Sequence, residues 1–266
     1  ITPFEKEITL KGPPIAEIVN EKLIVKIRIK PINPIITSKI EEQINPSIEL
    51  TLSDKDFDYL DSNKKEFVKT VLPIIINENQ NILMIRSFVN ELKGKLETFR
   101  TLNNNEIRKL NDIAKKYNIK YQNKHKLDLV DEILSNVDVI PNSIVLAQAA
   151  IESGWGKSRF AVEANNLLGI RTFDPGDDQL KPLNNPNATW GLRIFETKCE
   201  SISYYIDLLN HNHHYYKFRS ERISQHFSDK IDLERLAKTL AIYAEDVYYT
   251  QKIIRTIREL EAYDRD

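Results

Sequence analysis

The spacing of apolar residues changes near Ser62, and this change constrains the fold more than any other feature of the sequence. From Phe67 to Phe99, apolar side chains recur at steps of three and four residues. Side chains one helical turn apart share a face, so the pattern predicts a long amphipathic helix. Proline removes a helical hydrogen bond, so Pro73 is expected to kink or break this helix near its start. The same spacing returns in shorter stretches as far as Glu259, and the chain is predicted to be mainly α.

Residues 1–61 have a different character. Frequent prolines separate short runs of β type, and residues 22–30 show strand-like alternation. The prolines are Pro3, Pro13, Pro14, Pro31, Pro34 and Pro46. Such a pattern is typical of extended chain or a small sheet. We therefore predict two parts, an N-terminal extended or β appendage at residues 1–61 and a helical domain at residues 62–266.

Composition excludes several classes of protein. The chain has 266 residues, of which 41% are hydrophobic and 29% charged, as is ordinary for a soluble globular protein. Its formal net charge of -1 gives no overall field that would attract nucleic acid. Cys199 is the only cysteine, which rules out an intramolecular disulfide or a cysteine-rich zinc site. The longest apolar run, around residues 71–76, contains Pro73 and is far too short to span a membrane.

Neither a cofactor nor a metal is indicated. His211, His213 and His214 are not spaced as a helical i, i+4 pair, and no nearby acid completes a zinc set. The chain begins at Ile1, and we expect a processed product from which a signal peptide or anchor has been removed.

An alanine-rich apolar run at residues 141–153 is followed by Gly154 and Gly156, which predicts a buried helix that ends at these glycines. Residues 168–173 and 189–195 are predicted to form two strands, so that a small β-hairpin lobe follows the helix. The other helices are expected at 106–117, 127–134, 157–164, 196–209, 232–244 and 248–259.

Glu152 stands at the end of this apolar helix. The last turn of a helix carries partial negative charge, which disfavours a carboxylate, and apolar neighbours add a desolvation penalty of the same sign. Both effects raise the pKa and keep a proton available near neutral pH, as a glycosidase general acid requires. The alternative is a solvated glutamate that merely ends a helix.

Three segments resemble the Bax-like branch of the β-N-acetylglucosaminidases, glycoside hydrolase family seventy-three. The first is residues 147–161, AQAAIESGWGKSRFA, which resembles the signature of the family. The second, residues 163–170, resembles the next block, so that the signature motif spans 147–170. The third, residues 243–253, resembles the closing tyrosine motif. The resemblance covers roughly residues 62–263 and does not cover 1–61.

The resemblance implies a lysozyme-like helical fold with a glycan groove and cleavage of β-1,4 bonds after N-acetylglucosamine. The catalytic glutamate of the family falls on Glu152 and its active-site tyrosine on Tyr243. As a neutral phenol, Tyr243 would bond the N-acetyl group of the substrate or position water.

Three further residues are candidates for binding substrate. Trp155, three residues after Glu152, would stack on a sugar face or seal the core. Trp190 in the hairpin would face the groove or pack inside the lobe. Asn166 would contact substrate or form a turn. The basic run at residues 217–222 is expected to be a solvated face, with anionic cell-wall polymer as its alternative partner.

The second catalytic group departs from the family pattern. Many members carry a second acid in the hairpin, where this chain offers Asp174, Asp177, Asp178 and Glu196 outside any motif that we recognise. Either the N-acetyl group of the substrate acts as nucleophile, or Asp177 or Asp178 activates water in an inverting reaction. The sequence leaves both routes open.

The sequence thus predicts a peptidoglycan hydrolase of the periplasm, cell envelope or secreted fraction that acts on glycan strands, with no protein partner indicated. A lytic transglycosylase that uses the same glutamate is one alternative. A wall-binding module without activity is the other.

Overall fold

The computed structural model describes residues 15–19, 22–26, 49–53, 59–226, 228, 230–244 and 246–260. It divides into two compact units, residues 1–77 and residues 78–266, which are treated separately below. The division falls inside one long helix, whereas the sequence suggested a boundary at Ser62. A domain that begins at Ser62 stays a prediction.

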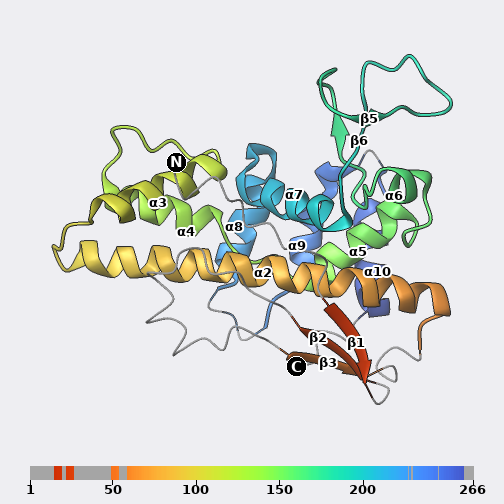
Figure 1. The fold of residues 1–266 in the computed structure, drawn as a ribbon, viewed down its shortest axis with the longest axis horizontal. Helices are drawn as coiled ribbons and strands as arrows, with labels where there is room; N and C mark the ends of the chain where they lie inside the picture. Colours follow the sequence, from red (N-terminus) through yellow and green to blue (C-terminus); the bar gives the residue numbers. More distant parts are fainter. Residues whose placement is uncertain are drawn as a thin grey trace. The chain divides into compact units, whose positions relative to one another are not determined.

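The first unit contains a three-stranded antiparallel sheet in the order β1-β2-β3 (Figure 1). Its strands are Ile15–Val19, Lys22–Lys26 and Glu49–Ser53. In the register, Leu23 of β2 pairs with Ile18 of β1 and with Leu52 of β3. The predicted strand at residues 22–30 is therefore confirmed over Lys22–Lys26, and residues 27–30 lie outside the described residues.

Helix α2, Ser62–Glu97, runs without a break through Pro73, so the expected break there is wrong. Leu72, Ile74 and Ile75 beside the proline are 2%, 5% and 0% exposed. A buried side chain of this size contributes roughly 1.5–3 kcal/mol. Together the three outweigh the ~3 kcal/mol that a proline costs inside a helix.

The second unit is mainly helical and carries a small sheet, as predicted (Figure 1). The short sheet has the order β4-β6-β5, and Arg171 of β4 pairs with Leu192 of β6. The third strand, β5, and the helix α8 were not predicted. The elements are α3 (Asn104–Lys116), α4 (Lys126–Asn136), α5 (Asn142–Ser153), α6 (Arg159–Glu163), β4 (Arg171–Thr172), β5 (Gln179–Leu180), β6 (Gly191–Arg193), α7 (Lys198–His211), α8 (Tyr216–Ser224), α9 (Leu233–Thr239) and α10 (Tyr249–Leu260), with 3₁₀ turns η2 (His213–Tyr215) and η3 (Ala241–Tyr243).

Helix α5 forms the centre of this unit. Every residue from Ser143 to Ala150 is buried, so this helix has no face in solvent over two turns. Helix α10 packs along it, and α9 contacts α10 in turn. The alanines suit this position, because small side chains let neighbouring helices approach closely while retaining the best helix propensity. The prediction of a buried alanine-rich helix is confirmed.

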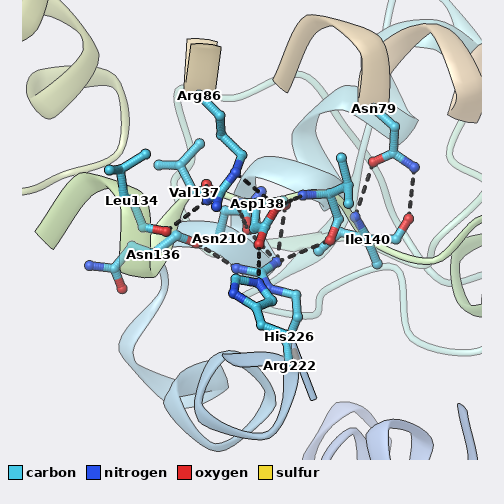
Figure 2. A network of polar contacts seen from close by, with 11 residues as sticks. Asn79, Arg86, Leu134, Asn136, Val137, Asp138, Ile140, Asn210, Arg222 and His226 are labelled. Atoms are coloured by element: carbon cyan, nitrogen blue, oxygen red, sulfur yellow. Dashed lines mark hydrogen bonds and ion pairs between the residues drawn. The ribbon is translucent and has the colours of Figure 1, made fainter. Parts of the chain in front are cut away.

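A buried polar network holds the segment between α4 and α5 (Figure 2). The carboxylate of Asp138 lies 3.1 Å from Nε of Arg86 on α2 and 2.7 Å from Nε2 of His226. Arg222 of α8 donates to the backbone carbonyl of Asp138 at 3.0 Å and to Oδ1 of Asn210 on α7 at 2.8 Å. The segment is thereby tied to three helices at once.

Asn79 secures the other end of the same segment. Its Nδ2 donates to the carbonyl of Ile140 at 2.7 Å, and its Oδ1 accepts from the amide of Ile140 at 3.0 Å. Both backbone groups of Ile140 are therefore paired just before α5 begins, which fixes the start of the central helix.

Removing Asp138 should destabilise the protein strongly. Asp138→Ala leaves two arginines without their buried counter-charge, and the loss of one partner of a buried pair typically costs about 3–5 kcal/mol. Glu234→Ala is the matched control, because Glu234 pairs with Arg258 at the surface and exposed pairs are worth roughly 0–1 kcal/mol. Denaturant unfolding measures both free energies. Equal losses in the two variants would contradict a supporting role for the network.

Candidate active site

Glu152 lies in the last turn of α5, and the helix ends as the glycines predict. Gly154 is in the left-handed region, with φ +56°, and forms the C-cap. The amide of Trp155 donates to the carbonyl of Ala150 at 2.8 Å, which closes the end of the helix. Glycine adopts this conformation without the strain that a Cβ adds, so the chain turns sharply one residue after Ser153.

Trp155 also has a positive φ, of 57°. A non-glycine residue in this region carries a cost of roughly 1–2 kcal/mol, and such strain is frequent at functional sites. Its side chain is half-buried.

The carboxyl group of Glu152 lies against the backbone at Gly169. A Cβ placed on Gly169 would be 3.1 Å from Oε2 of Glu152, and Gly169 itself has φ +65°. Glycine meets both demands without strain, whereas a larger residue here would strain the backbone and crowd the carboxyl group. Sequence reasoning assigned no role to this glycine, although it lies in the second block of the family motif.

Four tyrosines surround the buried side of the glutamate. The ring of Tyr243 lies 5.5 Å from Tyr205, 6.4 Å from Tyr215 and 6.0 Å from Tyr249, measured between centroids. The ring of Tyr205 meets Tyr243 edge-on, at 86°, whereas Tyr249 stacks on it at 11°. Helices α7 and α10 and the turns η2 and η3 thus each supply one phenol to the cluster.

A chain of hydrogen bonds leads through this cluster to Glu152. Tyr205 donates its hydroxyl proton to Oε1 of Gln148. Nε2 of Gln148 donates to the hydroxyl oxygen of Tyr249 at 3.0 Å. Because that oxygen already accepts a bond, the single proton of Tyr249 is free for the carboxylate of Glu152, to which it is hydrogen-bonded.

Gln148 fixes the direction of this chain. It is fully buried and lies one helical turn before Glu152 on α5. An amide carries both an acceptor and a donor, so Gln148 accepts from Tyr205 and donates to Tyr249, whereas a carboxylate could only accept. Gln148, Tyr205 and Tyr249 were not predicted as site residues. A glutamine in the middle of an apolar helix is the sequence signal that could have found the first of them.

Burial raises the pKa of Glu152 above its usual range. The hydrogen bond from Tyr249 and the charges of Arg171 and Lys252 lower it by less. The direction is the one expected from the sequence. Burial also raises the pKa of Tyr215 to about 12 and the pKa of Tyr243 well above its usual value, so the phenols beside the glutamate stay neutral.

Tyr243 does not hydrogen-bond the glutamate directly. Its hydroxyl donates to the backbone carbonyl of Leu168, the residue before Gly169. It therefore ties the loop that lies against Glu152 to the tyrosine cluster. Tyr243 therefore lies beside the site, and its hydroxyl proton is already engaged by the carbonyl of Leu168.

Asn166 is buried, and its amide bonds only to the protein. Nδ2 donates to the carbonyls of Ile170 and Arg193 at 2.8 and 2.9 Å, and Oδ1 accepts from the amide of Ile170 at 2.9 Å. This geometry favours the turn-forming interpretation. Trp190, in contrast, is half-buried in the hairpin lobe, with the guanidinium of Arg171 4.6 Å from its ring centre.

The three aspartates of the hairpin lobe differ in their contacts. Asp177 accepts from Oγ1 of Thr172 at 2.6 Å and pairs with Arg193 at 3.7 Å. Asp174 accepts from the amide of Gly176 at 2.9 Å. Asp178 is exposed.

Within the described residues, no group of three histidine, cysteine, aspartate or glutamate side chains is placed to hold a metal ion. No described helix has the length and apolar character needed to cross a membrane.

A glutamate of raised pKa, held by a neutral phenol at the end of a buried helix, defines a candidate glycosidase acid. Comparison with known proteins agrees with this class. Residues 127–262 match the Glucosaminidase family, described as mannosyl-glycoprotein endo-beta-N-acetylglucosaminidase. The chain belongs to this family of glycoside hydrolases.

Among its relatives is the protein Bax of Escherichia coli strain K12, which is 30% identical over 198 residues, 73% of this chain and 68% of that one. The peptidoglycan hydrolase FlgJ of the same strain is 23% identical over 149 residues, 52% of this chain and 45% of that one. The catalytic domain of the autolysin Auto from Listeria monocytogenes shares 19% identity, with 68% of this chain and 86% of that one covered, at a TM-score of 0.35.

Replacing Glu152 should stabilise the fold in a pH-dependent way. The folded-state pKa of Glu152 is raised, so ionisation favours the unfolded chain once the pH exceeds the unfolded value of about 4.3. Glu152→Gln removes this penalty. We expect the variant to unfold at higher denaturant than the parent at pH 8, and the difference to vanish at pH 4. A parent that is the more stable of the two at pH 8 would contradict the burial argument.

Proposed function

We propose that the chain hydrolyses peptidoglycan at the β-1,4 bond after N-acetylglucosamine, with Glu152 as general acid. The observation that carries the proposal is the partly buried glutamate whose pKa burial raises and which Tyr249 holds from one side. A protonated carboxyl group can give its proton to the glycosidic oxygen as the bond to the sugar breaks. The name of the relative FlgJ supports peptidoglycan as the substrate.

Tyr249 is proposed to orient this acid. Gln148 holds the phenol in place, and the phenol directs its proton at the carboxyl group. Tyr243 is proposed to act one step further away, since it fixes the carbonyl of Leu168 and thereby the loop at Gly169. The tyrosines thus position the carboxyl group of Glu152 before the glycan binds.

The nucleophile is proposed to be the N-acetyl group of the substrate. Its oxygen attacks the anomeric carbon as Glu152 protonates the leaving oxygen, and water, deprotonated by the Glu152 carboxylate, then opens the intermediate. The contacts of Asp174 and Asp177 support this route, because both carboxylates are used inside the hairpin lobe. Asp178 carries no such side-chain contact within the described residues, so it is the aspartate that the inverting route would use.

Because peptidoglycan lies outside the cytoplasm, we propose the periplasm or cell envelope as the site of action. Trp155 and Trp190 are proposed sugar contacts, because each has a half-buried ring. Asn166 is not proposed to touch substrate, because its amide groups are used inside the protein.

The products released from purified sacculi test the reaction. We expect new reducing ends of N-acetylglucosamine in the retained β configuration, identified by mass spectrometry and NMR. Glu152→Gln should slow their release by about 10²–10⁴-fold, the usual contribution of a general acid. Glu163→Gln, an exposed glutamate paired with Arg159, is the matched control and should cut normally.

Three results would contradict this reaction. Anhydromuramic ends would identify a lytic transglycosylase, and the inverted anomer would identify an aspartate-dependent attack of water. An absence of products from the parent protein would identify a wall-binding module.

The role of Tyr249 is tested by the pH dependence of the rate. Its hydrogen bond lowers the pKa of Glu152, so Tyr249→Phe should raise that pKa and move the alkaline limb of kcat/KM to higher pH. The rate at the optimum should fall by about tenfold, the equivalent of one hydrogen bond to a charged group. Tyr248→Phe, which alters an exposed neighbouring phenol, is the control. An unmoved alkaline limb in Tyr249→Phe would remove this tyrosine from the positioning of the acid.

A further inference from the structure

A cavity of about 720 Å³ lies between the η2–α8 segment and the α9–η3 segment. The lining holds lysine, arginine and histidine side chains and no carboxylate, and the remaining side chains are apolar or neutral. The lining residues are His213, His214, Tyr216, Lys217, Arg219, Lys238, Thr239, Ala241 and Ile242. Nothing in the proposed reaction uses this cavity.

Two ammonium groups at the cavity are available to a ligand. Lys217 of α8 and Lys238 of α9 are both exposed. Neither has an ion pair or hydrogen bond to a side chain in the described ranges, whereas many other lysines of this unit do, such as Lys93, Lys95 and Lys252. The two lysines come from different helices and meet at one cavity, which a solvated face of a single helix would not produce.

Arg219 adds a fixed positive charge. Its guanidinium is buried and donates to the carbonyls of Leu209 at 3.0 Å and Asn212 at 2.8 Å. These carbonyls are neutral acceptors, so they hold the side chain without cancelling its charge. The prediction that residues 217–222 form a solvated face is therefore wrong for Arg219 and Arg222, which are buried, and fits only the lysine.

The cavity adjoins the candidate active site through two short turns. Turn η2 supplies His213 and His214 to the cavity and Tyr215 to the tyrosine cluster. Turn η3 supplies Ala241 and Ile242 to the cavity and Tyr243 to the same cluster. A ligand in the cavity therefore lies one residue along the chain from two tyrosines that line the site of Glu152.

We propose that this cavity binds a carboxylate carried by the muramic acid side chain of the glycan strand. The proposal rests on the proposed function, because it takes peptidoglycan as the polymer. N-acetylglucosamine is neutral, so the anionic groups of the strand are carboxylates on the muramic acid residues, either in the stem peptide or on the bare lactyl group. Ammonium groups bind carboxylates through charge-assisted hydrogen bonds, and Ala241 and Ile242 suit the aliphatic parts of such a side chain.

The basic cavity would determine which strands are bound and how they are placed. An uncharged N-acetylglucosamine oligomer offers the lysines no negative charge, whereas a peptide-bearing strand would be held at a fixed offset from Glu152. Since the chain has a net charge of only -1, this attraction is local and does not come from the protein as a whole.

Binding of three soluble probes to the full chain tests the proposal. The probes are glycan strands with stem peptides, strands stripped of peptide so that lactyl carboxylates remain, and a neutral N-acetylglucosamine oligomer. Each is titrated against Lys217→Gln/Lys238→Gln in a Glu152→Gln background, so that no probe is consumed. The matched control is Lys115→Gln/Lys120→Gln, which removes the same charge at two other exposed lysines.

We expect the cavity variant to weaken the Kd of peptide-bearing strands by about tenfold or more, which is the loss of at least 1.4 kcal/mol. The neutral oligomer should bind all variants equally, and the effect should shrink in high salt. The lactyl carboxyl is free only where the stem peptide is absent. Stripped strands that lose the same factor therefore show that the cavity accepts either carboxylate, and stripped strands that lose nothing assign the site to the peptide alone. Equal binding of every probe by the cavity and control variants would overturn the proposal.

The two proposals fail in different ways. If the parent protein releases no products from sacculi but its binding still depends on Lys217 and Lys238, the reaction is wrong and the cavity stands. If the parent cuts sacculi and binds strands without regard to these lysines, the cavity is wrong and the reaction stands. Equal unfolding midpoints of the cavity and control variants exclude a loss of fold as the cause.

Discussion

Burial of α5 from Ser143 to Ala150 is the constraint on which the rest of this unit depends. Most polar groups on a helix without a face in solvent need partners inside the protein. Gln148 finds two tyrosines, and Ser153 bonds the carbonyl of Ala149 at 2.5 Å. Glu152, in the last turn of the helix, is hydrogen-bonded to the phenol of Tyr249. The raised pKa of Glu152 is thus a consequence of where the helix lies. The network around Asp138 holds the segment that leads into this helix (Figure 2).

The site combines two features that are each unfavourable for stability. The carboxyl group of Glu152 is desolvated, and Trp155 has a positive φ. Backbone strain and shifted pKa values are common at functional sites, because the chemistry needs conformations and protonation states that are unfavourable in water. The buried Arg222, whose pKa burial lowers to about 10, belongs to a different category, because its charge is met by Asp138 and serves the fold alone.

Local patterns in the sequence predicted most of the fold. The apolar spacing gave α2, and the alanine-rich run with its two glycines gave α5 and its end, because these features depend on neighbours along the chain. Helix α8 escaped notice because Arg219 and Arg222 are buried there, where apolar residues would normally mark the inner face. Strand β5 has only two residues, too few to show an alternation.

The candidate site was predictable only in part for the same reason. An apolar run and a family motif mark Glu152 in the sequence. Tyr205, which bonds Gln148, and Tyr249, which bonds Glu152, come instead from helices far away in the chain. Contacts between residues of distant helices leave no pattern of spacing in the sequence. The sequence does not show that Lys217 and Lys238 are neighbours either. The two lysines line one cavity only because α8 and α9 pack against each other.

The approach of Glu152 to Gly169 has a consequence for stereochemistry. Oε2 of the carboxyl group faces Gly169 so closely that a Cβ there would crowd it, and the neutral phenol of Tyr249 hydrogen-bonds the same carboxyl group. These two neighbours restrict the directions in which the carboxyl group can give its proton. The protein thus limits the approach of the glycosidic oxygen before any sugar is bound, and a residue without a side chain contributes to that limit.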